Sequence, residues 1–591
     1  MADVEKLITE HIDVWTSAIK KRNATGRGSN KKIELTGIKK LRELILELAV
    51  RGKLVPQDAS DEPASLLLEK ISQIKQQLIS NKTIKKTRKQ PEISIEEQLY
   101  TLPSGWAWAR LEDVYDVRDG THDSPKAQLT GYPLVTSKNL SSGKLDLSDI
   151  KYISEADHLK IIARSKVDRD DILFAMIGSI GNPVIVDLEP DFSIKNVGLF
   201  KYFDKDLSVP LFLKNYLIYA SVIMKSQSGG GVQPFVSLGK LRSFVISLPP
   251  LAEQHRIVAK VDELMALCDQ LEQQTEQSLS AHQTLVEVLL ASLTNGISTD
   301  GDSKEDFQSS WQRIAEHFDV LFTTEASIEQ LKQTILQLAV MGKLVPQNPN
   351  DEPASVLLDK IAEEKAQLIA DKKIKKQKPL PAITDEEKPF ELPNGWEWTT
   401  LSHIGVFTGG KTPSKANSDY WNGDVPWVTP KDMKVEEIFD SEDHVTKLAI
   451  TDGLAQIDTE SLLFVARSGI LRRKFPVAIT KSVCTVNQDL KVLSLIDKYI
   501  ANYVLLMMKG FEMYILENLT KIGTTVESLR FDDFSKHYFI MPPLKEQQRI
   551  VAKVDELLAL CDQLKARLGD AQTTQLHLAD AVVENALGDA L

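Results

Sequence analysis

One stretch of the sequence matches a pattern that binds nucleotide phosphates in other proteins. Residues 405–412 read GVFTGGKT, which fits the expression G-x4-G-K-T. In a phosphate loop, backbone N–H groups and the lysine cradle the phosphates, and a helix begins directly afterwards. Here Pro413 follows at once, then SKANSDYW, which has no amphipathic pattern, and no candidate magnesium-binding Asp ends a later parallel strand. The context argues against nucleotide binding and favours a flexible Gly-Lys-Thr loop.

Two proline pairs resemble part of the catalytic motif of an N6-adenine methyltransferase. That motif is Asp/Asn-Pro-Pro-aromatic, and its polar groups hold the amino group of a flipped base. The chain reads LPPL at residues 248–251 and MPPL at residues 541–544, so apolar residues flank both pairs. No Gly-rich dinucleotide-type loop precedes them in the sequence. We interpret both pairs as prolines that begin a helix and predict no catalytic residue.

Composition bounds the class of protein. The 591 residues are 42% hydrophobic and 26% charged, with a formal net charge of −12, as in an ordinary globular protein of several domains. The first residues carry acids rather than an apolar core, and no run of about 18 apolar residues exists, so we expect neither a signal peptide nor a membrane span. Cys268 and Cys561 occupy the same position of a repeated segment, and we interpret both, together with Cys484, as core residues rather than metal ligands or a disulfide. Free cysteines are typical of the reducing cytoplasm, where we expect the protein to be located.

The elements that must position any functional residue are written twice. Residues 253–271 read EQHRIVAKVDELMALCDQL, and residues 546–564, 293 positions later, read EQQRIVAKVDELLALCDQL. Apolar residues recur at three- and four-residue steps with charges between them, which predicts an amphipathic helix. A helix over residues 251–293 would be roughly 65 Å long. A helix of that length with one apolar stripe needs a partner helix.

A second repeated block precedes each long helix. Residues 41–57 (LRELILELAVRGKLVPQ) match residues 331–347, DEPAS recurs at 61–65 and 351–355, and LPxGWxW at 102–108 and 392–398, all 290 positions apart. By these offsets, the end of the chain stops about where its beginning takes up the pattern. We therefore expect the N-terminal helices to pack against the C-terminal long helix, as residues 306–347 pack against the central one.

Between the repeated blocks lie two segments of nearly equal length and low similarity. They share an order of elements: a β-like run (132–136; 425–429), a buried strand (172–177; 462–466), an apolar helix (209–224; 499–508) and a last strand (244–248; 538–541). We predict a mixed α/β protein with two α/β domains held apart by two long antiparallel, coiled-coil-like helical pairs, pseudo-two-fold and circularly arranged. The expected boundaries are 1–101, 102–248 (domain 1), 249–391, 392–541 (domain 2) and 542–591.

This pattern resembles the specificity subunit of Type I restriction-modification systems. The residues that carry the resemblance are GKLVPQ…DEPAS, LPxGWxW and PPLxEQxRIVAKVDEL, each present twice with a variable domain between, over essentially the whole chain. The resemblance implies that each variable segment is a target recognition domain for double-stranded DNA. It also implies that the helices space the two domains and dock two adenine methyltransferase subunits, with motor-nuclease subunits when present. S-adenosylmethionine, ATP and magnesium then belong to those partners, and this chain carries no cofactor.

Because the variable domains are roughly charge-balanced, we expect local clusters rather than a global field to bind DNA. The candidates in domain 1 are Thr121, His122, Lys126, Thr136, Ser137, Lys138 and Asn139. The candidates in domain 2 are Lys411, Thr412, Lys415, Thr429, Lys431, Arg467, Ser468, Arg472 and Arg473. Simpler interpretations remain open: His122 could cap a turn, and Arg472-Arg473-Lys474 could be a solvated hairpin tip.

Two other functions compete with a non-catalytic DNA-specifying subunit. One is a coiled-coil assembly scaffold without DNA contact. The other is a nucleotide-dependent DNA enzyme that uses residues 405–412.

Overall fold

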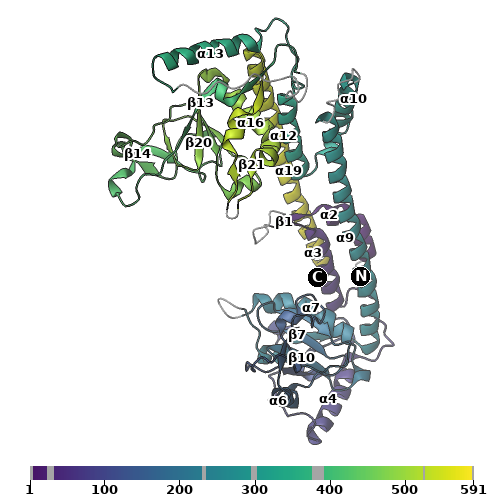
Figure 1. The fold of residues 1–591 in the computed structure, drawn as a ribbon. Helices are drawn as coiled ribbons and strands as arrows, with labels where there is room; N and C mark the ends of the chain where they lie inside the picture. Colours follow the sequence, from purple (N-terminus) through teal and green to yellow (C-terminus); the bar gives the residue numbers. More distant parts are fainter. Residues whose placement is uncertain are drawn as a thin grey trace. The chain divides into compact units, whose positions relative to one another are not determined.

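The computed structural model describes residues 4–22, 32–228, 234–294, 303–375, 392–523 and 526–588. The chain divides into two compact units. Unit 1 contains residues 1–278 and 571–591, and unit 2 contains residues 279–570. Each unit combines helices with one mixed α/β domain (Figure 1). The C-terminal residues belong to unit 1, together with the N-terminal region.

Two long helices follow the proline pairs. They are α9 (Leu251–Thr294) and α19 (Leu544–Gly588). In each first turn, a backbone N–H bonds back to the second proline: Gln254 to Pro250 over 3.0 Å, and Gln547 to Pro543 over 2.9 Å. Both pairs therefore begin helices, as the sequence predicts.

Helix α3 (Thr36–Val50) contacts both long helices within unit 1. Arg42 on α3 forms ion pairs with Asp269 and, over 2.6 Å, with Glu272 on α9. Two residues earlier on α3, Lys40 pairs with Asp580 on α19. Helix α3 therefore joins the first part of α9 to the last part of α19. The other elements of this region are α1 (Val4–Glu10), α2 (Ile12–Ser17), β1 (Lys20–Arg22), β2 (Lys32–Glu34) and α4 (Ala64–Ser80).

Unit 2 repeats these contacts around α12 (Glu325–Val340). Lys332, the counterpart of Arg42, pairs with Asp562 on α19. Gln330, the counterpart of Lys40, donates to Glu287 on α9 over 3.0 Å. The apolar residues Val286, Leu290 and Leu293 of α9 share one core with α12. The neighbouring helices are α10 (Ser303–Glu316), α11 (Phe318–Leu321) and α13 (Ala354–Ala370).

Domain 1 is built on an antiparallel sheet in the order β4-β10-β7-β8, and a smaller sheet has the order β6-β5-β9. All four residues of the central strand β7 are buried, which fits its uninterrupted apolar sequence ILFA. The strands are β4 (Tyr115–Asp119), β5 (Tyr132–Val135), β6 (Lys151–Ile153), β7 (Ile172–Ala175), β8 (Gly181–Ile185), β9 (Ser193–Ile194) and β10 (Val197–Tyr202). The helices are α5 (Leu111–Val114), α6 (Glu155–Ser165), α7 (Pro210–Ser226) and α8 (Leu238–Ser243).

Domain 2 has the same plan, with sheets in the orders β13-β20-β17-β18-β15 and β16-β14-β19. The strands are β13 (Gly405–Gly409), β14 (Trp421–Val428), β15 (Glu437–Ile438), β16 (His444–Val445), β17 (Leu462–Val465), β18 (Val477–Thr480), β19 (Thr485–Val486), β20 (Leu490–Leu495), β21 (Thr520–Lys521) and β22 (Ser528–Leu529). The helices are α14 (Leu401–Ile404), α15 (Lys447–Thr451), α16 (Ala501–Gly510), α17 (Glu512–Asn518) and α18 (Phe531–Lys536). Strand β14 begins earlier than expected because a register shift between Trp421 and Val425 extends its pairing.

In each domain, the first and last strands pair with each other in a two-stranded antiparallel sheet, which we call the closing ladder. In domain 1, β3 (Ala107–Arg110) pairs antiparallel with β11 (Val245–Leu248). In domain 2, β12 (Glu397–Thr400) pairs with β23 (Tyr538–Met541) in the same way. The first and last strands of each domain therefore lie side by side, directly ahead of a long helix.

Candidate nucleic-acid interface

The carboxyl ends of four strands meet at one edge of each domain. Strands β4 and β7 both pair antiparallel with β10, so they run in the same direction, and β5 is parallel to β9. Domain 2 repeats this with β13 and β17 beside β20, and with β14 parallel to β19. We call the loops that follow these strands the C-terminal edge. It comprises residues 119–122, 136–139, 176–178 and 194–196 in domain 1, and residues 409–412, 429–432, 466–468 and 486–489 in domain 2.

Hydrogen bonds join these loops in domain 1. The Thr121 N–H donates to Ile194 O over 3.0 Å, and the Asn196 N–H donates to Thr121 O over 3.1 Å. The Ser137 hydroxyl donates to Asn196 O over 3.4 Å. Two stretches predicted separately from the sequence are thus brought together by Asn196, which sequence reasoning missed.

Domain 2 joins the equivalent loops with different side chains. The Lys411 N–H donates to Val486 O over 3.0 Å, which reproduces the bond of Thr121. The Thr412 hydroxyl bonds to Gln488, at the positions that His122 and Asn196 occupy in domain 1. The two domains therefore share the backbone hydrogen bonds of this edge but expose different side chains on it.

A glycine permits the close approach at each loop. A Cβ atom on Gly120 would overlap the carbonyl oxygen of Ile194, and one on Gly410 would overlap the carbonyl oxygen of Asn487. These glycines are required because another strand end passes against their Cα atoms.

His122 belongs to a polar cluster rather than to a simple turn cap. Its side chain is 63% exposed, with Nε2 3.0 Å from Asp119 Oδ2 and Nδ1 2.9 Å from Asn196 Oδ1. Asp119 is buried and also binds Arg164 on α6. The cluster holds an imidazole and a guanidinium at the surface of the C-terminal edge, and both ring nitrogens of His122 are engaged by Asp119 and Asn196.

The threonine turns are internal to the fold. Thr136 N donates to Asn139 Oδ1 over 2.9 Å, and Thr429 N donates to Asp432 Oδ2 over 2.8 Å. Asn139 and Thr429 are only 6% and 7% exposed, and the Asn139 amide also donates to Asp146 O over 2.9 Å. Because their polar groups are used within these turns, we leave both residues out of the proposed DNA contacts.

The cations of the candidate set remain at the surface. Lys138 pairs with Asp149, and Lys431 lies 3.9 Å from Glu442. The exposed members are Lys126, Lys138, Lys411, Lys415, Lys431, Arg467, Arg472 and Arg473.

The Arg472 segment is an ordered one-turn 3-10 helix, η6 (Gly469–Arg472), rather than an open hairpin tip. Ser468 caps it, since its hydroxyl accepts from Ile470 N over 3.4 Å. Arg472 forms an ion pair with Glu527, and this hydrogen bond lowers the pKa of the Glu527 carboxyl.

The phosphate-loop pattern has no phosphate-loop geometry. Residues 405–409 form strand β13, and the segment from Thr412 continues as a loop instead of beginning a helix. Pro413 is buried, and the Lys411 carbonyl accepts from the Trp427 indole over 3.2 Å. The loop is held as part of the C-terminal edge.

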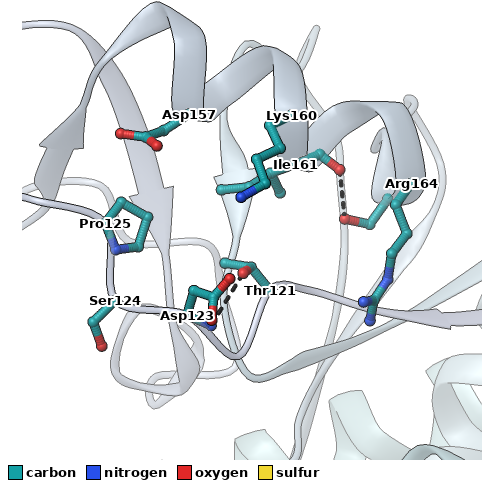
Figure 2. A pocket seen from close by; sticks show the side chains of 9 residues that line it. Thr121, Asp123, Ser124, Pro125, Asp157, Lys160, Ile161 and Arg164 are labelled. Carbon is teal, nitrogen blue, oxygen red and sulfur yellow. Dashed lines mark hydrogen bonds between the residues drawn. The ribbon is translucent and has the colours of Figure 1, made fainter.

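A pocket lies beside this loop in each domain. In domain 1, a pocket of about 240 Å³ separates the loop from α6, and Figure 2 shows the Lys160 amino group pointing towards Thr121 and Asp123. In domain 2, a pocket of about 380 Å³ lies between the Lys411 loop and α15. Lys160 and Arg164 were missed from the sequence because only the packing of α6 against the loop brings them to the edge.

Comparison with known proteins identifies the family. A family model for the Type I restriction modification DNA specificity domain matches residues 103–281 and 393–570. Over 610 residues, the chain is 40% identical to the Type I restriction enzyme EcoAI specificity subunit of Escherichia coli, covering 99% of this chain and 100% of that one. This chain belongs to the Type I restriction-modification DNA specificity subunits.

One further curated relative and one solved structure were also matched. The EcoEI specificity subunit of Escherichia coli is 38% identical over 611 residues, covering 99% of this chain and 100% of that one. The crystal structure of the HsdS subunit from Thermoanaerobacter tengcongensis is 18% identical, with a TM-score of 0.37, over 84% of this chain and 100% of that one.

The chain is thus a DNA specificity subunit with two target recognition domains, as the resemblance in its sequence implies. Specificity subunits of this family bind DNA and assemble with other subunits. Among the described residues, no group of His, Cys, Asp and Glu side chains could hold a metal ion, and no helix is long and apolar enough to cross a membrane.

Proposed function

We propose that the C-terminal edges of domains 1 and 2 each read one half of a bipartite DNA target. The observation that carries this proposal is the repeated edge: the backbone contacts recur, whereas the side chains they present differ. His122 and Asn196 occupy one domain where Thr412 and Gln488 occupy the other. Because base edges are distinguished by their donors and acceptors, the two half-sites differ in sequence and the target is asymmetric.

The repeated helices set the unread spacer and dock the partners. Two copies of one framework bind two copies of one partner, which we infer to be adenine methyltransferase subunits, joined by motor-nuclease subunits when present. The chain itself is a non-catalytic subunit of the cytoplasm. S-adenosylmethionine, ATP and magnesium act in the partner subunits. The net charge of −12 fits a subunit whose partners share the phosphate contacts.

The test is a genome-wide map of methylated adenines in cells that contain the cognate methyltransferase, with and without this chain. We expect a split, asymmetric motif that disappears with the chain. An unchanged map contradicts the proposal and favours an assembly scaffold without DNA contact.

The modular part of the proposal has its own experiment. Exchange of residues 102–248 for the corresponding domain of another specificity subunit should change one half of the motif only. The adjacent strands β3 and β11 make this exchange structurally feasible, because both ends of the insert lie side by side. A change in both halves contradicts independent readout by the two domains.

A nucleotide-dependent enzyme is a weaker candidate, since residues 405–412 do not form a phosphate loop. It predicts nucleotide turnover by the isolated chain that Lys411→Ala abolishes. Absence of turnover by the wild-type chain eliminates it.

A further inference from the structure

At one equivalent position of the C-terminal edge, domain 1 has apolar side chains and domain 2 has polar ones. In domain 1, Ile177 pairs with Phe235 in an isolated antiparallel bridge. In domain 2, an isolated antiparallel bridge joins Arg467 to Ser528. By the 290 and 293 offsets of the sequence repeat, Arg467 is the counterpart of Ile177, and Ser528 that of Phe235.

The neighbouring hydrogen bonds confirm that these bridges are equivalent. In domain 1, the Val236 N–H donates to Met176 O over 2.9 Å. In domain 2, the Leu529 N–H donates to Ala466 O over 2.8 Å, at the same two positions of the repeat. The difference between the domains therefore lies in the side chains and not in the path of the backbone.

Both bridges continue the row of loops described above. The register of β10 against β7 places Val197 opposite Ala175, so the segment from Met176 lies beside Asn196, the partner of His122. In domain 2, the Arg467 N–H donates to Asp489 O over 3.3 Å, next to Gln488. The bridges of Ile177 with Phe235 and of Arg467 with Ser528 therefore belong to the C-terminal edge of their domains, next to the loops of His122 and Thr412.

The side chains at these positions are free to contact a ligand. Phe235 is 48% exposed, although phenylalanine is usually buried, and its ring contacts no other aromatic ring among the described residues. Arg467 is exposed, and its guanidinium has no hydrogen-bond or ion-pair partner in the described part of the chain. Arg472, by contrast, is already bound to Glu527.

We propose that Phe235 contacts a thymine methyl group in the half-site of domain 1, and that Arg467 contacts a guanine in the half-site of domain 2. This inference rests on the proposed function and names what each edge reads. An apolar ring matches the methyl group that thymine presents in the major groove. A free guanidinium fork matches the O6 and N7 acceptors of guanine.

The experiment uses the complex of this chain with its methyltransferase subunits and a duplex carrying the motif found in cells. Each thymine of the first half-site is replaced in turn by uracil, which lacks only the methyl group. Each guanine of the second is replaced by 7-deazaguanine, which lacks the N7 acceptor. Affinities are measured for the wild type, Phe235→Ala and Arg467→Ala.

For the wild type, one uracil should weaken binding about 4-fold, the equivalent of one buried methyl group. Phe235→Ala should weaken binding to the natural duplex and be insensitive to that uracil. One 7-deazaguanine should weaken wild-type binding, and Arg467→Ala should lose roughly 5- to 150-fold and become insensitive to it. Each variant should respond normally to substitutions in the other half-site.

Leu211→Ala and Lys498→Ala are matched controls, because these residues follow β10 and β20 and so lie beyond the opposite edge of each domain. The inference is overturned if either variant binds like the wild type, or if it loses the same factor on natural and modified duplexes. A wild-type complex without any sequence preference instead contradicts the proposed function itself.

Discussion

Gly410 has no room for a side chain, whereas the preceding residue, Gly409, does. A Cβ on Gly410 would overlap the Asn487 carbonyl, whereas a Cβ on Gly409 would lie 3.5 Å from Lys491 Nζ in ordinary contact. The loop that carries Lys411 and Thr412 therefore depends on one glycine and not on its neighbour.

We expect Gly410→Ala to displace this loop and weaken specific DNA binding at least 10-fold, because the fixed backbone carbonyl must move. Gly409→Ala should bind within about 2-fold of the wild type. Binding of a duplex with the cellular motif, measured beside one with a scrambled second half-site, checks both variants. Equal behaviour of the two alanine variants contradicts the role assigned to the close approach.

The exposed lysines beside the two pockets lack the forked geometry that reads a base. Lys160 and Lys411 each place a single ammonium group at the C-terminal edge, which suits a backbone phosphate. We expect Lys160→Ala and Lys411→Ala to weaken binding to all sequences equally. Each should also reduce the slope of log affinity against log salt by about 0.9. Titration at several salt concentrations measures this slope; an unchanged slope with altered base preference contradicts it.

Among the elements, the closing ladder of domain 1 is tied to the long helix by one buried bond. The Trp106 indole donates to Glu253 Oε2 over 2.9 Å, and Gln57 donates to Oε1 over 3.2 Å. Burial raises the pKa of the Glu253 carboxyl, while these two donors partly oppose the shift. Trp396 and Glu546 occupy the equivalent positions of domain 2, and burial raises the pKa of Glu546 as well.

The sign of the resulting pH dependence follows from this shift. The folded chain holds the Glu253 proton at a pH where the unfolded chain, with a pKa of about 4.3, has lost it. The contribution of Glu253 to stability is therefore greatest below the unfolded pKa. It falls as the pH rises towards the raised folded pKa.

We expect Trp106→Phe to cost about 1–3 kcal/mol near neutral pH, where a buried carboxylate loses a donor. The cost should be smaller near pH 4, where the carboxyl is protonated. Thermal unfolding of unit 1 at both pH values measures it. Trp108→Phe is the control, because Trp108 packs on the Tyr100 ring at 5.0 Å in the same region. An equal cost at both pH values contradicts the role of ionised Glu253.

At this scale the sequence is informative about the framework. The repeat, the helices that follow both proline pairs and the closing strands were predictable because their apolar periodicity and spacing are local. The loops of the C-terminal edge were located, but the roles of Asn139 and Thr429 were not, because a buried turn and an exposed donor look alike in sequence. Asn196, Arg164 and Phe235 reach the edge through long-range sheet pairing and packing, for which a single divergent sequence has no local signal.

In the whole molecule, the two ends of the chain stabilise each other. Residues 571–591 group with unit 1, and Lys40 on α3 binds Asp580 on α19. Ala579 and Ala586 are buried.

We expect a stop after Asp570 to unfold part of unit 1 and to leave unit 2 intact. Hydrogen exchange should show loss of protection in α3, since this helix loses the partner of Lys40, and no change in domain 2. The reciprocal deletion of residues 1–50, which removes α3, should reduce protection in residues 571–588. Retained protection of α3 in the shortened chain contradicts the circular arrangement.

The equivalent contacts of α3 and α12 with the long helices are consistent with an origin of the chain by gene duplication. Lys40 and Gln330 bind the same position of opposite long helices, Asp580 and Glu287. Two separate copies of one half-length chain could make both contacts by exchanging their helix ends, so an ancestor with a single recognition domain could have worked as a homodimer on a palindrome. Gene fusion would have kept both contacts, and the second copy was then free to diverge. One such change is at Glu272, which binds Arg42, because its counterpart is Lys565, which binds Glu329.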